Sequence, residues 1–591
     1  MHPAVPLPHD GGRALTVLTP TGQTPPQVVT GTDHVIVFDG RLDDRDALDG
    51  RAGGDADLML RAFVREGGDA FAKLRGPFAV VIWNRAGDSV VCAHDALGAF
   101  PLFYAQLGQD LLVSPFQDVL VGQPRVPKQL DAVALAEWIL YSVADVSDTF
   151  FTGIKRLPPA HRLSFDRAVE LRRYWHPEND PSGVPAQPDE VHAAFDELLV
   201  QAVERCLRPP RAGVLLSGGV DSGVVAAVAA ERTRAAGSSA PLALGAAFPD
   251  RSSNEVAGQR AVAAALGIEL VLLPVDEAGP EGILLPVLQS ARDSALPSTV
   301  PWETPYSRLA AVARERGCRS LLTGDGGNEL LEAGWELAAD LLRASDVRAL
   351  RRLYRLGRSY YGASRRRMLW RLGWRSGARI VVRERIGTLA GTAGDFARAR
   401  YLRRYDATIH ASLIPDQTVR RRVVERMLAL HPAPGRGPVY AALRRARHED
   451  PGLALQLESN FAWDRHVGLE TLSPLMDVDL IRFLYHVPPE LLSFGGRAKG
   501  LAQASLERRV ATSVLPQLRA AFFEDYFQTV MLREGRRALA ALGGVPILSG
   551  LGIADEKALH LAVDSSYAPR HLGYSHLWAI LGLEAWLRAR L

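Results

Sequence analysis

The chain has 591 residues, too many for a single hydrophobic core, so two or more domains are expected. Its 47% hydrophobic and 23% charged residues are ordinary for a soluble globular protein, and a net charge of +3 gives no sign of nucleic-acid binding. Three widely spaced cysteines exclude a disulfide framework and a zinc site. No apolar run reaches membrane-spanning length, so we expect a cytoplasmic protein without a membrane partner.

The first part of the chain has the alternation of apolar and polar residues that is typical of β-strands. Strands are predicted over 34–40, 76–84 and 88–95, with one helix near 57–66. We expect a sheet-based domain over 1–125. A connecting segment over 126–190 follows, and its proline-containing end is the best candidate for a linker.

The remainder, 191–591, alternates short apolar strands with helical patterns. Strands near 213–216, 242–248, 269–273 and 319–323 are separated by helices near 222–234, 254–266 and 304–316. This order predicts an α/β fold with a doubly wound parallel sheet, whose ligands bind at the carboxyl ends of the strands. Helices should continue to the end of the chain.

The region from about 338 to 448 is helical in pattern and very rich in arginine. Its arginines recur at helical spacing among Leu, Trp and Tyr, so solvated helix faces are the simplest interpretation. A surface for a peptide substrate, or for a partner that delivers it, is the functional alternative. RNA binding is not favoured.

The string Ser-Gly-Gly-Val-Asp-Ser at 217–222 links a predicted strand to a helix. Backbone N–H groups and the helix dipole favour an anion at such a turn, and the hydroxyls of Ser217 and Ser222 add donors. Asp221 supplies a carboxylate for a divalent cation. The alternative to a phosphate and metal site is an ordinary strand-to-helix turn. In that case Asp221 would be favoured there only because its charge interacts well with the helix dipole. No lysine follows the glycines, which argues against the Gly-x-x-x-x-Gly-Lys-Ser/Thr loop, because the lysine of that loop contacts the terminal phosphates.

This string resembles the PP-loop of ATP pyrophosphatases, which cleave ATP between its α- and β-phosphates. A second glycine turn, "LLTGDGGNELLEAG" (321–334), follows another predicted strand. Together with the motifs at 74–105, 472–477 and 495–509, the two turns resemble glutamine-dependent asparagine synthetase. The resemblance implies a class II glutamine amidotransferase-like domain joined to an ATP pyrophosphatase domain that uses ATP and Mg²⁺.

Two departures from that family refine the prediction. His2 stands where the synthetases have a cysteine nucleophile, so we expect the first domain to be a degenerate glutaminase. β-Lactam synthetases and lasso-peptide cyclases also keep this amino-terminal domain without its glutaminase chemistry. Asp325 replaces the Glu of asparagine synthetase and the Tyr of β-lactam synthetase. With the divergent helical region and the ending at 577–591, it favours a lasso-peptide cyclase.

The resemblance also assigns roles to individual residues. ATP phosphates would contact Ser217, Gly218, Gly219 and Ser222, and the nucleoside would contact Leu215, Thr323 and Gly324. Mg²⁺ would be held by Asp221 and Asn328, more weakly than in the family because Asn328 replaces an Asp. Lys499 would stabilise charge on the adenylate and pyrophosphate, and Asp325 would deprotonate or position the attacking amine. The alternatives are a core position for Leu215, a solvated Lys499 and a loop-capping Asp325.

The predicted reaction joins an Asp or Glu side chain of a precursor peptide to the peptide's own amino terminus. The carboxylate attacks the α-phosphorus of ATP, pyrophosphate leaves, and the amine displaces AMP to close an isopeptide macrolactam. Expected partners are the core peptide, a leader-peptide recognition protein and a leader peptidase. The alternatives are an asparagine synthetase-like or β-lactam synthetase-like ligase for a small molecule and, more remotely, a tRNA-modifying PP-loop enzyme.

Overall fold

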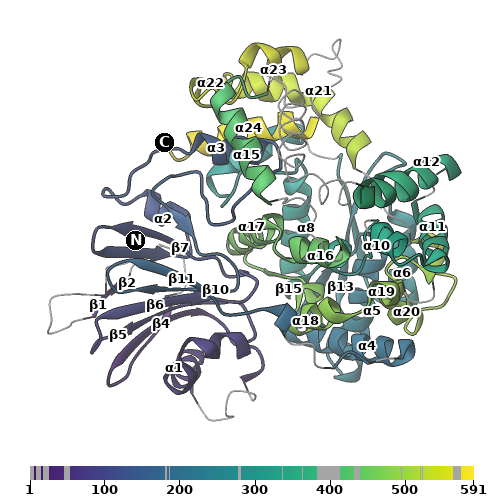
Figure 1. The fold of residues 1–591 in the computed structure, drawn as a ribbon, viewed down its shortest axis with the longest axis horizontal. Helices are drawn as coiled ribbons and strands as arrows, with labels where there is room; N and C mark the ends of the chain where they lie inside the picture. The colour runs from purple at the N-terminus through teal and green to yellow at the C-terminus, as the bar shows by residue number, and fades with distance from the viewer. Residues whose placement is uncertain are drawn as a thin grey trace.

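The structure is a computed structural model of the chain. It describes residues 5–7, 15–17, 25–45, 53–179, 183–185, 187–276, 281–335, 337–361, 364–382, 413–430, 439–493, 496–518, 521, 523–563 and 574–591. Figure 1 shows a sheet domain at one end, a second sheet covered by helices at the other, and a helical layer above both. No helix of these residues is long and apolar enough to cross a membrane.

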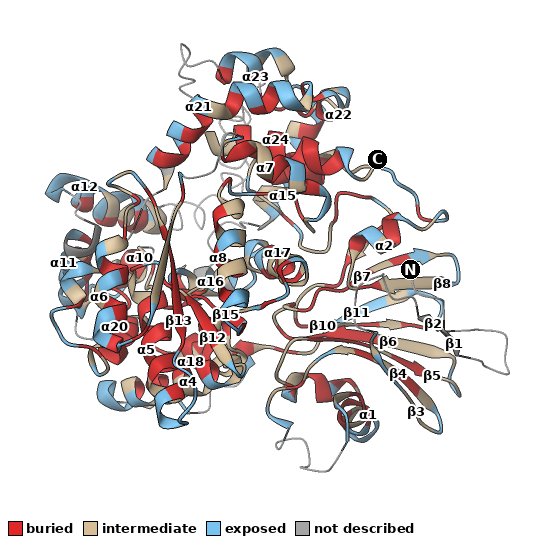
Figure 2. Ribbon diagram, turned by 180° about the vertical axis from the view of Figure 1, so that it is seen from behind, coloured by how far each residue is buried: buried red, intermediate tan, exposed pale blue. Residues whose placement is uncertain are grey.

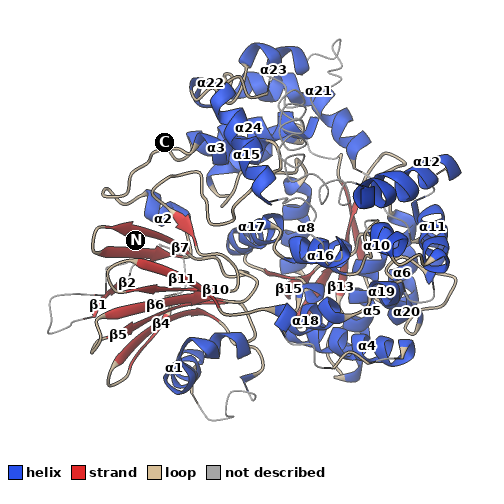
Figure 3. Ribbon diagram, viewed as in Figure 1, coloured by secondary structure: helices blue, strands red, loops and turns tan. Residues whose placement is uncertain are grey.

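The first domain is built on a six-stranded antiparallel sheet, seen in red in Figure 3. Its strands, in spatial order, are β11 (Val169–Arg173), β10 (His161–Phe165), β6 (Ser89–His94), β5 (Phe78–Asn84), β4 (His34–Gly40) and β3 (Gln27–Thr30). Ile36 and Phe38 of β4 are fully buried against Leu58 and Met59 of α1 (Asp55–Glu66). The alternation along these strands therefore places one apolar face of the sheet under the helix.

This sheet continues past residue 125, the end that we expected for the first domain. β10 pairs with β6 from Arg162↔Ala93 to Phe165↔Val90, and β11 pairs with β10. A smaller sheet contains β8 (Asp110–Ser114), β7 (Phe103–Leu107) and β9 (Lys155–Arg156), and β1 (Val5–Leu7) pairs with β2 (Leu15–Val17). Much of the segment expected to be a connection therefore completes the two sheets.

The second domain contains a five-stranded parallel sheet, which confirms the predicted α/β architecture. Its order is β14 (Leu270–Pro274), β13 (Leu242–Ala247), β12 (Arg211–Leu215), β15 (Cys318–Leu322) and β16 (Glu470–Leu472). The four strands expected from the sequence are all present. The edge strand β16 was not predicted, because its three residues are too few to show a pattern.

Helices cover both faces of this sheet, as Figure 2 shows by the red core beneath pale blue surfaces. The predicted helices are α5 (Val220–Ala235), α6 (Val256–Leu266) and α8 (Glu303–Glu315). Residues 222–230 of α5 are all buried, because the helix lies between the sheet and helices α4 (Pro188–Cys206) and α20 (Gly500–Glu507). The small side chains of that run allow this close packing on every side.

The remaining helices pack beside the two sheets or form the helical layer above them. They are α2 (Gln117–Val121), α3 (Ala132–Ile139), α7 (Leu284–Gln289), α9 (Gly327–Leu330), α10 (Leu337–Arg343), α11 (Val347–Tyr361), α12 (Arg365–Leu369), the π-helix η5 (Trp370–Ala378), α15 (Gln417–Leu430), α16 (Val439–His448), α17 (Pro451–Val467), α18 (Val478–His486), α19 (Pro489–Leu492), α21 (Glu524–Leu542), α22 (Pro546–Gly550), α23 (Glu556–Ala562) and α24 (Tyr574–Arg588). Residues 383–412 and 431–438 of the predicted arginine-rich region lie outside the described residues.

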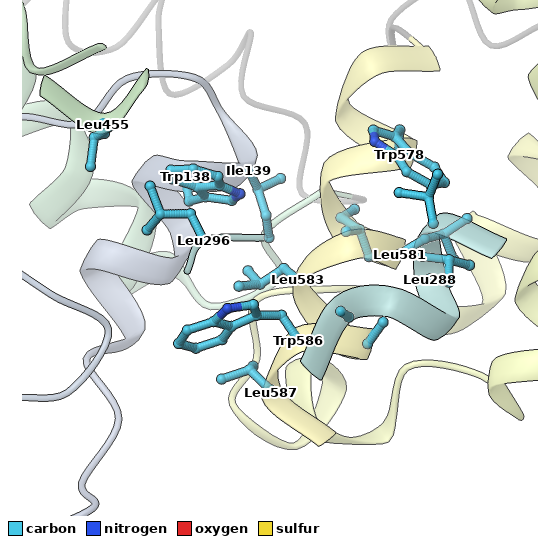
Figure 4. Packing of buried hydrophobic residues seen from close by; sticks show 14 of the residues in the cluster. Trp138, Ile139, Leu288, Leu296, Leu455, Trp578, Leu581, Leu583, Trp586 and Leu587 are labelled. Atoms are coloured by element: carbon cyan, nitrogen blue, oxygen red, sulfur yellow. The ribbon is translucent and has the colours of Figure 1, made fainter. Parts of the chain in front are cut away.

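The centre of the helical layer is the last helix of the chain. Trp578 and Trp586 of α24 are fully buried, and Figure 4 shows α24 beside α3, which carries Trp138 and Ile139. Leu296 lies next to Trp138 in the same view. The apolar ending of the sequence is therefore a core helix that holds α3 in place.

Candidate active site

The two glycine loops predicted from the sequence lie side by side. The first follows β12 and the second follows β15, and these strands are neighbours at the centre of the sheet. The chain passes from β12 to β13 on one side, whereas β15 and β16 extend the sheet on the other. The loops therefore flank the point at which the strand order reverses, where ligands of open α/β sheets bind.

Hydrogen bonds within the first loop fix its shape. The Ser222 hydroxyl accepts a bond from the Ser217 backbone N–H at 3.0 Å and lies 2.8 Å from the Ser217 hydroxyl. Gly218 has a left-handed φ of +81°, and a Cβ there would lie 2.7 Å from the Glu255 carbonyl oxygen. Gly219 then caps α5. The loop is a preformed turn with backbone donors at a helix N-terminus, as an anion requires.

The second loop contacts the first at Asp221. A Cβ on Gly327 would lie 2.2 Å from the Asp221 carboxyl carbon, so only glycine fits at this position. Asp221 is the first acidic residue of α5, and burial raises the pKa of its carboxyl while the nearby ammonium of Lys499 lowers it. The close approach explains why a glycine-rich sequence follows both strands.

Lys499 lies between the two residues expected to bind Mg²⁺. Its ammonium donates to Asp221 Oδ2 at 2.5 Å and to Asn328 Oδ1 at 2.6 Å, and its side chain is only 4% exposed. Lys499 has a left-handed φ of +51° and immediately precedes α20. The predicted catalytic lysine is thus not a solvated surface residue.

The donor set of this site fits a single divalent cation. Asp221 Oδ1 is buried and has no hydrogen-bond partner among the described residues, so this oxygen is available to a metal. The Asn328 carbonyl instead accepts from Lys499. The described residues contain no group of three or more His, Cys, Asp or Glu side chains that could hold a metal alone. Phosphate oxygens of a bound nucleotide would have to complete the coordination.

Asp325 occupies the second loop within a short hydrogen-bond chain. Its Oδ2 accepts from the Thr323 hydroxyl at 2.9 Å, and that hydroxyl lies 3.0 Å from the Ser473 hydroxyl. Burial raises the pKa of Asp325, and the negative charge of Asp221 raises it further. A carboxylate with a raised pKa is a stronger base near neutral pH.

A cavity of about 1900 Å³ opens above the two loops. Eight of the predicted site residues line it: Leu215, Ser217, Asp221, Ser222, Thr323, Gly324, Asp325 and Asn328. Gly218, Gly219 and Lys499 do not line it; Lys499 lies behind Asp221. Residues from the ranges 215–222 and 323–328, which are far apart in the chain and were predicted to form one site, therefore line the same cavity.

The far walls of the cavity were not predicted. They come from α3 (Trp138), the segment before α8 (Leu296, Val300), α15 (Met427) and α17 (Leu455, Trp463). Glu303 and Tyr306 of α8 also line it, and burial raises the pKa of both, that of Tyr306 to about 12. Helical spacing of apolar residues was the only signal for α17, and it does not distinguish a cavity wall from a core face.

Comparison with known proteins agrees with this geometry. The family described as Asparagine synthase matches residues 194–588, which include both loops, Lys499 and the cavity helices α8, α15 and α17 but not α3. The chain belongs to the asparagine synthase family. A second family, described as Glutamine amidotransferase domain, matches residues 19–175 and includes β10 and β11 of the first sheet.

Several curated proteins resemble parts of this asparagine synthase family member. Asparagine synthetase [glutamine-hydrolyzing] 3 of Bacillus subtilis is 28% identical over 37% of this chain and 38% of its own length. Asparagine synthetase [glutamine-hydrolyzing] 1 of the same organism is 24% identical over 54% of this chain and 51% of its own length. Amidase chry2 of Gibberella zeae is 24% identical over 56% of this chain and 51% of its own length. The chain thus matches about half or less of the length of these relatives.

The first domain of this family member contains one cysteine, Cys92, and the second domain contains Cys206 and Cys318. Cys92 is fully buried in β6, and burial raises the pKa of its thiol to about 12. Burial also raises the pKa of Cys206 to about 12 and that of Cys318 above its usual value. Position 2, where the sequence has His, lies outside the described residues.

Proposed function

We propose that the chain is an ATP-dependent, AMP-forming ligase that closes an isopeptide macrolactam in a precursor peptide. Membership of the asparagine synthase family supports amide formation through an adenylate. The observation that supports a peptide as the substrate is the large volume of the cavity. Its volume of about 1900 Å³ exceeds the roughly 300–1,000 Å³ that is usual for small-molecule sites.

The walls of the cavity divide its chemistry into two parts. The two loops provide the polar groups of Ser217, Ser222 and Asp325, and α3 and α17 provide apolar side chains such as Trp138 and Leu455. ATP suits the first part because of its phosphates. The second part offers area for apolar side chains of a peptide, which free aspartate does not have.

In the first step, a carboxylate oxygen of the peptide attacks the α-phosphorus of ATP and pyrophosphate leaves. The hydroxyls of Ser217 and Ser222, which line the cavity, hold the phosphates, and Gly218 and Gly219 shape the loop that presents them. Asp221 would hold Mg²⁺ through Oδ1, and the ion would neutralise phosphate charge. Lys499 adds a buried positive charge beside Asp221, where charge develops as pyrophosphate leaves.

In the second step, the amine of the peptide attacks the acyl carbon and AMP leaves. Asp325 accepts the proton of the amine, and Thr323 fixes the position of its carboxylate. The amine needs only a modest base, since an α-amino group has a pKa of about 8. Holding both ends of the peptide in one cavity makes ring closure intramolecular.

The test is incubation of the protein with a candidate precursor peptide and MgATP, followed by mass spectrometry and nucleotide analysis. We expect a product lighter by one water, with AMP and pyrophosphate. ADP and orthophosphate as direct products would rule out adenylation. Formation of asparagine from aspartate and ammonia would instead favour a small-molecule ligase, the alternative that the family also allows.

A further inference from the structure

The surface of α11, α12 and η5 has an unusual charge. Residues 347–382 contain eleven arginines and no Asp, Glu or Lys, although the whole chain has a net charge of only +3. The rest of the protein is therefore net negative. Nine of these arginines are exposed, and none has an ion-pair partner among the described residues: Arg348, Arg351, Arg352, Arg355, Arg358, Arg365, Arg366, Arg367 and Arg375.

Large apolar side chains are exposed in the same segment. Leu369, Trp370 and Trp374 are 55%, 56% and 51% exposed. The opposite face of this helical segment, with Met368 and Leu372, is buried in the protein. The segment is thus fixed by one apolar face and presents a second one to solvent, which soluble proteins usually avoid unless it binds something.

This surface is separate from the cavity. No residue of 347–382 lines the cavity in the part of the chain that the structure describes. Figures 1 and 2, which are opposite views, both place α11 and α12 at the edge of the molecule farthest from the first sheet. We call the nine exposed arginines with Leu369, Trp370 and Trp374 the Arg–Trp surface. Its members are exposed on helices at this outer edge, where a partner can reach them.

We propose that the Arg–Trp surface binds the headgroup region of an anionic phospholipid bilayer. Arginines pair with lipid phosphates, and Trp and Leu gain free energy by entering the interface between headgroups and acyl chains. RNA would pair with the arginines, but it usually stacks its bases in a groove and gains nothing from Leu369. Our expectation of no membrane partner came from the lack of a spanning segment, and surface binding requires none. The proposal does not depend on the proposed reaction.

The test is co-sedimentation with vesicles of phosphatidylcholine and phosphatidylglycerol in a three-to-one ratio, with pure phosphatidylcholine for comparison. We expect binding to the anionic vesicles that weakens with salt. Arg366→Gln/Arg367→Gln should lower the partition coefficient about tenfold or more. The matched control is Arg421→Gln/Arg422→Gln on α15, which removes the same charge from adjacent exposed arginines and should change little.

The apolar residues are tested separately with Leu369→Ser/Trp370→Ser/Trp374→Ser, which leaves every arginine in place. This variant should also bind about tenfold or more weakly, with unchanged circular dichroism. Failure of the wild type to bind anionic vesicles overturns the proposal. Equal vesicle binding by the apolar variant, together with tight binding of poly(U) by the wild type, overturns it in favour of a general polyanion site.

Discussion

Arg156 and Glu458 form a buried ion pair between β9 and α17. Arg156 Nε donates to Glu458 Oε2 at 2.5 Å, and the two side chains are 5% and 2% exposed. The same guanidinium donates to the carbonyls of Val146 and Asp148 at 2.6 and 2.8 Å. Leu455 and Trp463 of α17 line the cavity. The pair therefore fastens one wall of the cavity to the strand that completes the smaller sheet.

Removing one member of this pair should destabilise the protein strongly. Glu458→Gln leaves the Arg156 charge buried without a counter-charge, which typically costs about 3–5 kcal/mol. Arg125→Gln is the control, because Arg125 and its partner Asp110 are 68% and 55% exposed and such pairs contribute about 1 kcal/mol or less. Midpoints of urea unfolding measure both. Equal shifts for the two variants would contradict the structural role of the buried pair.

Glutamine should not donate nitrogen in the reaction. A thiol nucleophile must reach the thiolate state at neutral pH, and burial raises the pKa of Cys92, the cysteine of the first domain, to about 12. With ¹⁵N-amide glutamine in the assay, mass spectrometry should find no label in any product. Incorporated label would show that the first domain hydrolyses glutamine although Cys92 is buried.

Asn328→Asp should strengthen metal binding. It places a second carboxylate beside Asp221 Oδ1, which has no partner among the described residues. We expect several-fold tighter Mn²⁺ binding by calorimetry in the absence of peptide. Asn460→Asp adds the same charge to another wall of the cavity and is the control. If the two variants bind Mn²⁺ equally, the effect is general electrostatics and Asn328 is not at the metal site.

Asp464 should make stability fall as pH rises toward neutrality. Burial raises the pKa of Asp464 to about 7, whereas an unfolded Asp has a pKa of about 3.9. Its contribution is therefore fully present below pH about 4 and is lost as pH rises through about 7. Asp464→Asn does not titrate. Its amide oxygen can still accept the hydrogen bond that the Thr471 N–H donates to Asp464 Oδ2 at 2.7 Å in the wild type. The melting temperature of the wild type should fall relative to the variant between pH 5 and 8; a constant difference would contradict this.

Much of the fold was predictable because its signals are local. β12, β13 and β15 are apolar runs that end in turns, and the two loops require glycines whose spacing is visible in the sequence. β10 and β11 were assigned to a connection because pairing with β6 is a tertiary property. The family resemblance gave Lys499 a role in the site, but its contact with Asp221 was not predicted, since 278 residues separate the two.

The cavity walls show where local patterns reach their limit. Trp138 and Leu455 have the spacing of ordinary core residues on amphipathic helices. They line the cavity because α3 packs on α24 and because Glu458 holds α17 to Arg156. Both contacts join distant parts of the chain, so no window of the sequence contains them.

The last prediction separates the two steps of the proposed reaction. Lys499→Ala removes the buried positive charge beside Asp221, so it should reduce adenylate formation and cyclised product together. A reduction of about 10²–10³-fold is expected for loss of one charge-stabilising donor. Pyrophosphate exchange into ATP with the peptide present measures the first step, and mass spectrometry measures the second.

Asp325→Asn should affect only the later step. The variant keeps the size of the side chain and its bond to Thr323, but it loses the basicity that burial enhances. Exchange should therefore survive better than ring closure, which should fall by about 10²–10⁴-fold. Aspartate alone should not support exchange in the wild type, because it would leave apolar side chains of the cavity such as Trp138 and Leu455 without contacts. Strong aspartate-dependent exchange, with asparagine formed when ammonia is added, would instead assign the chain to small-molecule amide synthesis.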